Sequence, residues 1–292
     1  MDAKRRKVQA PYPVRGNRFE GKVALITGAA GNFGSVCARM MAAEGASVAL
    51  VDIVSDKLQA VVEDVQTSYK TAAKGFEVDV TKEEDVQRMV ADVKAEFGRI
   101  DCLFNNAGYQ GLFAPVDAYC FEDFDKVMKI NVTGVFAVLK HVSKVMVEQK
   151  TGSIVNTASC AGLGCPTSMP AYGSSKAAVT HLTKIAALDL APSGVRVNSV
   201  SPAFIGPEDG FMWKRQVELQ AKANPTGTSE FYYSDQPDKV AKQMIESVPM
   251  RRLGTPEEVI NTVLFLLSSE SSYITGTDIN VSGGNVLGGS RG

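Results

Sequence analysis

The sequence predicts an α/β fold, a single doubly wound parallel sheet with helices on both faces. Short apolar runs alternate with amphipathic stretches of helical period along nearly the whole chain, which is typical of β-α-β units. A glycine-bearing turn follows the first apolar run, and Asp52 ends the second. Because no repeat or linker divides the 292 residues, we expect one domain over 19–284 between a disordered basic tail (1–18) and a flexible tail (285–292).

The composition is that of an ordinary soluble protein. The chain is 45% apolar and 22% charged, and its net charge of −1 gives no reason to expect nucleic acid or a membrane as a partner. Five cysteines without any C-x-x-C indicate reduced thiols in a cytoplasmic compartment, and two histidines make a histidine-built metal site improbable. No apolar run reaches the ~18 residues of a membrane span. The basic run at 4–7 is a solvated tail or a targeting signal.

The positions of the helices and strands are predicted from the periodicity of apolar residues and from the residue types that end each element. Gly45 and Gly98 follow helical stretches where a C-cap glycine belongs. The long helix from residue 121 carries Asn-Val-Thr-Gly at 131–134, which is unfavourable inside a helix. It indicates either a packing kink or a place where Asn131 exposes its carbonyl to water. We expect strands at 23–27, 47–51, 75–79, 101–104, 154–158, 195–200 and 277–281, and helices ending near 44 and spanning 60–70, 82–97, 121–148, 172–190, 237–246 and 256–267.

The first strand, turn, helix and second strand form the context of a dinucleotide site. Gly28 lets the chain turn sharply out of the strand, and Gly34 lets the helix and a pyrophosphate approach closely. The helix N-terminus then offers free N–H groups to phosphate. Asp52 can accept hydrogen bonds from the ribose hydroxyls and would repel a 2′-phosphate. No arginine follows it, so the pattern favours NAD over NADP; the alternative is a structural turn with an accidental acid.

One position breaks the usual glycine spacing, because Asn32 stands where a third glycine is common. Asparagine is among the non-glycine residues most tolerant of left-handed φ and ψ angles. We therefore expect the turn to survive with Asn32 in place, with further freedom from Gly31.

Polar residues follow several strand ends. In an open parallel sheet the carboxyl ends of strands line the ligand crevice, so we expect Asp79 and Asn106 beside a cofactor. Ser159 ends the fifth strand, and Tyr172 and Lys176 follow at i and i+4 on one face of a helix. A hydroxyl, a phenol and an ammonium meeting at one point make a general acid/base site. The Tyr-x-x-x-Lys spacing alone also occurs on ordinary solvent-facing helices.

The stretch 203–236 departs from the alternation of strands and helices. It is rich in aromatic residues, with glycines and prolines at both ends. A segment of this length over the carboxyl edge of the sheet indicates a substrate lid.

These motifs together resemble those of the short-chain dehydrogenase/reductase family over about residues 20 to 284. In order they are Thr27-Gly28 to Gly34, Asp52, Asp79-Val80, Asn105-Asn106-Ala107-Gly108, Asn131, Ser159, Tyr172-x-x-x-Lys176 and Ser201-Pro202. The stretches NNAGYQGLFAP (105–115), FMWKRQVELQAK (211–222) and SVPMRR (247–252) more narrowly resemble bacterial NAD-dependent xylitol dehydrogenases. The resemblance implies a Rossmann-like sheet of order 3-2-1-4-5-6-7 and NAD-dependent oxidation of a polyol, best guess xylitol, to a ketose, D-xylulose. It also implies a homodimer or homotetramer.

The resemblance assigns roles to four residues. Tyr172 would be the base for oxidation and the acid for reduction, Ser159 would hold the reacting oxygen, and Asn131 would hold a relay water. Lys176 would bond the nicotinamide ribose and lower the pKa of Tyr172. Bringing a phenol from ~10 toward 7 takes about 4 kcal/mol, which a charge ~4 Å away supplies at an effective dielectric of ~20. No metal is implied. The expected cofactor contacts are Gly28, Asn32, Phe33, Gly34, Asp52, Ile53, Asp79, Val80, Asn106, Ala107, Gly108, Tyr172, Lys176, Pro202, Ala203 and Ile205, and the expected substrate contacts are Gln110, Ser159, Tyr172 and Trp213.

Two departures and two alternatives accompany this interpretation. Ala203 follows Pro202 where the family usually has glycine, and the lid is longer than in the xylitol dehydrogenases. One alternative is a reductase of 3-oxoacyl thioesters or hydroxysteroids, which the apolar lid residues 211–213 would suit. The other is a non-catalytic NAD(H)-sensing regulator, in which we would expect Tyr172 or Lys176 to be lost.

Overall fold

The computed structural model describes residues 16–164, 166–222 and 235–285. Most of both predicted tails and the middle of the predicted lid lie outside these ranges. The described chain is built on one sheet whose strands are all parallel, in the order β3-β2-β1-β4-β5-β6-β7, which confirms the predicted order. The strands are β1 (Val23–Thr27), β2 (Ser47–Asp52), β3 (Ala73–Glu77), β4 (Cys102–Asn105), β5 (Gly152–Thr157), β6 (Val195–Pro202) and β7 (Asp278–Val281).

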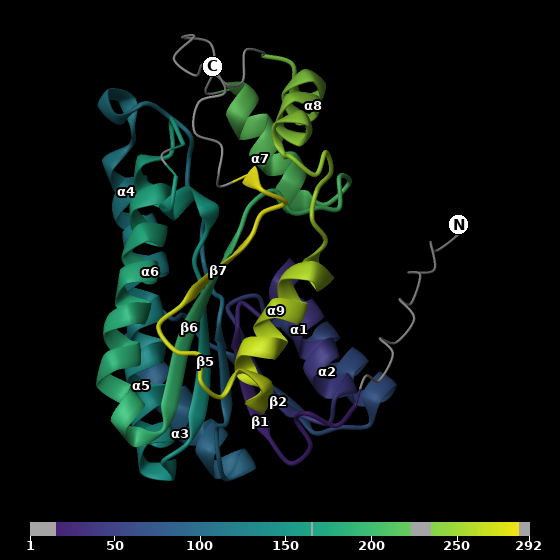
Figure 1. Ribbon diagram of the computed structural model, residues 1–292, viewed down its shortest axis with the longest axis vertical. Coiled ribbons are helices and arrows are strands. Elements are labelled where there is room, and N and C mark those ends of the chain that lie inside the picture. Colours follow the sequence, from purple (N-terminus) through teal and green to yellow (C-terminus); the bar gives the residue numbers. More distant parts are fainter. Residues whose placement is uncertain (1–15, 165, 223–234, 286–292) are drawn as a thin grey trace.

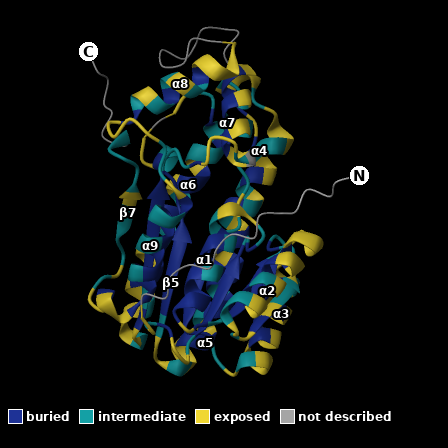
Figure 2. Ribbon diagram, turned by 90° about the vertical axis from the view of Figure 1, so that its right-hand side faces the viewer, coloured by how far each residue is buried: buried dark blue, intermediate teal, exposed yellow. Residues whose placement is uncertain are grey.

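Helices cover both faces of the sheet, and each face has its own apolar core (Figures 1 and 2). The central strands β1 and β4 are buried along their whole length, which explains why they are continuous apolar runs rather than alternating ones. One face is covered by α1 (Asn32–Ala43), α2 (Ser55–Tyr69) and α9 (Pro256–Leu267), and the other by α3 (Glu83–Phe97), α5 (Val135–Gln149) and α6 (Pro170–Leu190).

Two predicted boundaries were displaced. Helix α2 begins at Ser55, five residues before the predicted start. Strand β3 ends at Glu77 rather than at residue 79, because it pairs with β2 from Val48↔Ala73 to Asp52↔Glu77 and stops where its partner stops. Asp79 therefore lies in the loop after the strand, at the same carboxyl edge.

The predicted interruption of the long helix is a single widened turn. Helix α4 (Phe121–Met128) runs through a π-helical turn, η2 (Lys129–Gly134), into α5 without leaving helical angles. Gly134 is required there, since a Cβ would lie 2.9 Å from a methyl carbon of Val80. The stretch Phe121–Gln149 is long and apolar enough to cross a membrane, but 56% of its apolar window is buried inside the protein, as in a core helix.

Two helices lie at the carboxyl edge of the sheet: one stands inside the predicted lid and was not predicted as a helix, and the other confirms the helix predicted over 237–246. Helices α7 (Phe211–Lys222) and α8 (Pro237–Ser247) stand beyond the strand ends (Figure 1). They share a small core of Trp213, Val217, Ala221, Val240 and Met244.

Candidate active site

The turn after β1 is shaped by two glycines. Gly28 has a φ of +64°, and a Cβ there would lie 3.0 Å from the side-chain Nδ2 of Asn106. A Cβ on Gly34 would lie 2.1 Å from the carbonyl oxygen of Gly28, so α1 packs against the turn only with glycine at that position. Asp52 completes the turn, because its Oδ2 accepts from the backbone N–H of Ala30 at 2.9 Å.

The turn forms with Asn32 in place, as expected, but Asn32 does not use left-handed angles. The left-handed non-glycine residues of the described chain do not include Asn32, which is the first residue of α1. The turn is completed by Gly31 at the N-cap, so Asn32 needs only helical angles. Its Nδ2 instead donates to the carbonyl of Gly206 at 3.3 Å, which ties the glycine turn to the segment after β6.

The segment after β4 is held against β1 by a threonine. Thr27 Oγ1 accepts from the backbone N–H groups of Asn106 and Ala107 at 2.9 and 3.0 Å. The side chain of Asn106 donates back to the carbonyl of Thr27 and accepts from the hydroxyl of Thr157 at 3.2 Å. Gly108 then passes within reach of Lys176, because a Cβ on it would lie 3.6 Å from Nζ. Thr27 was not among the predicted contacts, although it precedes the first glycine directly.

The predicted cofactor residues line the carboxyl edges of β1 to β4 and β6. Asp79 accepts from the N–H and hydroxyl of Thr81; burial raises its pKa, but these bonds outweigh burial and lower it overall. Ile53, directly after Asp52, is 62% exposed, whereas Val80 is buried against the π-helical turn. Phe33 and Ile205 are partly buried against the core, Pro202 ends β6, and the N–H of Ala203 donates to Val281.

Ser159, Tyr172 and Lys176 come together from two elements. Ser159 lies two residues after the end of β5, at the N-cap of a short 3-10 helix, and Tyr172 and Lys176 lie in the first turns of α6. Lys176 is buried, and its Nζ lies 5.7 Å from the centre of the Tyr172 ring. Nζ also donates to the carbonyl of Thr157 at 2.7 Å, a backbone contact that the side-chain pattern could not reveal. Burial lowers the pKa of Lys176 from 10.5 to about 8.

The pKa of Tyr172 departs from the sequence-based expectation. Burial raises it above the ordinary value, and a hydrogen bond with Ser159 lowers it by less than burial raises it. Lys176 therefore does not lower the pKa of Tyr172 in the protein without a bound cofactor. The Tyr172 side chain is partly buried, and its phenol lies within hydrogen-bonding distance of Ser159.

Asn131 is fully buried, and its side chain serves the loop after β4. Its Oδ1 accepts from the N–H of Tyr109 at 2.8 Å, and its Nδ2 donates to the carbonyl of Tyr109 and to Ser175 Oγ at 2.9 and 3.0 Å. The Ser175 hydroxyl in turn donates to the carbonyl of Tyr172. Both amide hydrogens of Asn131 are thus used by protein groups, so a water at Asn131 would have to donate to an oxygen, either the main-chain carbonyl or the second lone pair of Oδ1.

The predicted substrate residues differ in their surroundings. Gln110 lies after the Asn106–Gly108 segment and is contacted by Arg215 of α7 at 3.5 Å. Trp213 is only 4% exposed, and it packs edge-on against Phe204 inside the core of α7 and α8. In this position Trp213 packs α7 against α8. A contact between Trp213 and the substrate stays a prediction. Arg215 was not singled out from the sequence.

No group of three or more His, Cys, Asp or Glu side chains that could hold a metal ion occurs within 16–164, 166–222 and 235–285. The reactive arrangement at the carboxyl edge consists instead of a phenol, a hydroxyl and a buried ammonium.

Residues 22–215 match the short chain dehydrogenase family. The chain belongs to this family. Residues 221–285 also match the family described as enoyl-(acyl carrier protein) reductase.

Several short-chain dehydrogenases resemble this chain over nearly its whole length. The crystal structure of an NAD⁺-bound xylitol dehydrogenase is 50% identical, with a TM-score of 0.87 over 91% of this chain and 99% of that one. Levodione reductase of Leifsonia aquatica is 35% identical over 91% of this chain and 95% of its own length. The 3-oxoacyl-(acyl-carrier-protein) reductase FabG of Thermotoga maritima is 35% identical over 92% and 100%. This short-chain dehydrogenase is therefore an oxidoreductase acting on a secondary alcohol or ketone.

Proposed function

We propose that this short-chain dehydrogenase interconverts a polyol, with xylitol as the best candidate, and the corresponding ketose, D-xylulose, with NAD as the cofactor. The observation that carries the proposal is the 50% identity, over almost the full length of both chains, to the NAD⁺-bound xylitol dehydrogenase. The glycine turn, Asp52 and the Ser159–Tyr172–Lys176 arrangement supply the groups that such a reaction requires.

The chemistry of the residues fits NAD. Asp52 ends β2 with its Oδ2 bonded to the turn and its Oδ1 to the N–H of Val54 at 3.0 Å, so the carboxylate faces the turn with acceptor capacity left for hydroxyls. A 2′-phosphate would meet this negative charge. The tight Gly28–Gly34 approach leaves the first N–H groups of α1 open to a pyrophosphate. The nicotinamide, when bound, supplies the hydride acceptor for alcohol oxidation.

The protein's own residues handle the substrate oxygen and its proton. Ser159 holds the hydroxyl oxygen, and Tyr172 takes the proton during oxidation and returns it during reduction. Lys176, held by the carbonyl of Thr157, places a cation beside the phenol and stabilises the phenolate. The main-chain carbonyl of Asn131 holds the water that passes the proton onward. The described part of the predicted lid, residues 203–222 with α7, acts as a lid over this site.

The cofactor assignment is tested at Asp52. In the wild type, NADH should bind more tightly than NADPH. Asp52→Ala should weaken NADH binding by about tenfold and tighten NADPH binding, because it removes both the ribose acceptor and the repulsion, ~1.4 kcal/mol for each factor of ten. Titration of cofactor fluorescence measures both dissociation constants. Asp52→Asn, which keeps an acceptor for the turn, separates charge from turn geometry. Tighter wild-type binding of NADPH would contradict the assignment.

The substrate is tested with a panel of pentitols, hexitols, hydroxysteroids, cyclic diketones and acetoacetyl thioesters with NAD(H). We expect the highest kcat/KM with a pentitol and its ketose, read as NADH absorbance. Activity confined to thioesters would instead support the 3-oxoacyl reductase alternative, which the likeness to FabG favours. Binding of NADH without turnover of any panel member would support the NAD(H)-sensing alternative.

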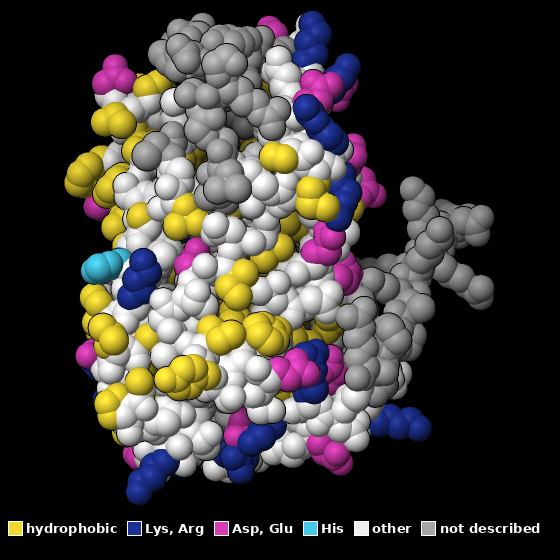
Figure 3. Space-filling view, in the orientation of Figure 1, with side chains coloured by type: hydrophobic (Ala, Val, Ile, Leu, Met, Phe, Trp, Pro, Cys, Tyr) yellow, Lys and Arg dark blue, Asp and Glu magenta, His cyan; other side chains and the backbone are white. Residues whose placement is uncertain are grey.

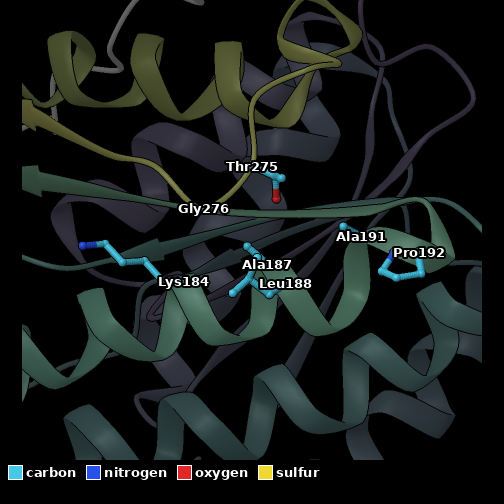
Figure 4. A pocket seen from close by; sticks show the side chains of 7 residues that line it. All are labelled: Lys184, Ala187, Leu188, Ala191, Pro192, Thr275 and Gly276. Carbon is cyan, nitrogen blue, oxygen red and sulfur yellow. The ribbon is translucent and has the colours of Figure 1, made fainter.

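We also propose that the chain is a cytoplasmic homodimer or homotetramer. Apolar side chains are exposed on α5 and α6, where Phe136, Ile185 and Leu188 are 48%, 47% and 78% exposed. Figure 3 shows hydrophobic side chains along the face of α6, β7 and α9. Leu188 borders an apolar hollow of about 400 Å³ between α6 and the residues before β7 (Figure 4). Sedimentation at the monomer mass of 31.2 kDa would contradict the assembly.

A further inference from the structure

Helix α7 is tied to the loop after β4 by one side chain, Arg215. Its Nη2 donates to the carbonyl of Gly111 at 3.2 Å, and its Nη1 donates to Oε1 of Gln110 at 3.5 Å. The guanidinium carbon lies 5.7 Å from the centre of the Tyr109 ring. A single cation of the lid thus contacts three successive residues of the loop.

The loop is held firmly at the point where Arg215 reaches it. Gly111 has a φ of +74°, and a Cβ there would lie 2.6 Å from a methyl carbon of Val127, so the backbone packs directly on α4. Asp123 accepts from the N–H of Leu112 at 2.8 Å and from the Tyr109 hydroxyl at 3.2 Å. The carbonyl of Gly111 is therefore presented to α7 in one fixed position.

Tyr109 connects this contact to the catalytic helix. On its ring, Lys126 lies 4.8 Å from the centroid and Arg215 lies 5.7 Å from it. On its backbone, both the N–H and the carbonyl are bonded to the side chain of Asn131. Asn131 also donates to Ser175, the neighbour of Lys176 in α6. A continuous set of contacts therefore runs from the lid helix through Tyr109 and Asn131 to the turn that carries the reacting groups.

We propose that Arg215 is a positioning residue that couples the seating of α7 to the orientation of Asn131. With Arg215 in contact, Tyr109 is fixed on its ring and on its backbone, and Asn131 holds the π-helical turn and Ser175 in register. Without that contact, the loop keeps its bonds to Asp123 of α4 and to Asn131 but loses its tie to α7, and the Asn131 amide loses part of its orientation. The kinetic readout of this inference rests on the proposed function, whereas its exchange readout does not.

The test is a double-mutant cycle between Arg215 and Tyr109. We expect Arg215→Met to lower kcat for the best panel substrate by about tenfold, the cost of a small misplacement of reacting groups, while the dissociation constant of NADH stays within about twofold. Tyr109→Leu should cost as much or more, and the double variant no more than Tyr109→Leu, because both changes act through one contact. Arg215→Lys, which keeps the charge over the ring, should recover part of the loss. The matched control is Lys214→Met, which removes an exposed cation one residue earlier on the same helix.

Hydrogen–deuterium exchange of the cofactor-free protein gives a second readout. In Arg215→Met, amides of 105–112 and 129–134 should exchange at least several-fold faster than in the wild type, and in Lys214→Met they should not. Equal behaviour of Arg215→Met and Lys214→Met in both measurements, or independent losses that multiply in the double variant, would overturn the inference. If Arg215→Met does not fold, Arg215→Lys carries the same comparison. A wild type without turnover of any polyol defeats the proposed function alone, and the exchange measurement then decides the coupling.

Discussion

Replacing Tyr172 with phenylalanine should lower kcat for alcohol oxidation by about 10²–10⁴-fold, the usual contribution of a positioned base. In the proposed mechanism the phenolate oxygen of Tyr172 takes the substrate proton. Phenylalanine removes that oxygen and keeps the ring, so the packing of α6 is preserved. NADH binding, measured by fluorescence, should stay within about twofold of the wild type, since hydride transfer needs the base and cofactor binding does not. Reduction of the ketose should fall by a similar factor.

The pH dependence of the wild type gives a second view of the same proton. The pKa of Tyr172 is raised by burial, so the phenol is protonated at neutral pH. The kcat/KM for oxidation should therefore rise with pH until the phenol has titrated, while that for reduction should be constant at low pH and fall over the same range. In Tyr172→Phe this dependence should be absent.

A matched control is Tyr119→Phe, which also removes a tyrosine hydroxyl. The hydroxyl of Tyr119 donates to the carboxylate of Asp123 at 2.7 Å. Turnover by this variant should remain within about threefold of the wild type, because a lost hydrogen bond of this kind costs ~1 kcal/mol of stability and no chemical step. Turnover by Tyr172→Phe at the level of Tyr119→Phe would contradict the assignment of Tyr172 as the base.

Replacing Lys176 with methionine should abolish most of the activity and yet stabilise the cofactor-free protein at pH 7. Burial lowers the pKa of Lys176 from 10.5 to about 8, which corresponds to a cost of ~3 kcal/mol for keeping the ammonium charged inside the protein. Methionine has a similar length and no charge. The lost hydrogen bond from the charged ammonium to the carbonyl of Thr157 offsets ~1.5–3 kcal/mol of this gain, so we expect a net gain of up to about 1.5 kcal/mol in the free energy of unfolding.

The stability effect has a defined direction with pH. The folded-state pKa of this base is lower than the unfolded-state value, so its cost to folding is complete below about pH 8 and disappears as pH rises toward 10.5. The advantage of Lys176→Met should shrink over that range. Denaturant unfolding at several pH values measures it, and Lys57→Met, at an exposed position on α2, is the matched control. A less stable Lys176→Met at pH 7 would show that the charge is not costly where it lies.

Much of the site could be predicted because it is local in the sequence. The glycine turn and Asp52 belong to one strand–helix–strand unit, and Tyr172 and Lys176 share a helix face by their spacing alone. The parallel strand order was also predictable, since the motifs resemble those of a known family. The pKa of Tyr172 was not, because it depends on how much water the folded chain excludes around the phenol.

The sequence by itself determined the sheet and the glycine turn and predicted the acid/base residues, because each rests on short-range periodicity or on a residue type that the chemistry requires. Only the tertiary structure decided how these groups are held. Asn32 bonds to Gly206, 174 positions away in the chain, and Arg215 bonds to Gly111, 104 positions away. The contact of Lys176 with a backbone carbonyl leaves no trace in the side-chain pattern. Such contacts depend on the distances between elements after packing, which no local pattern encodes.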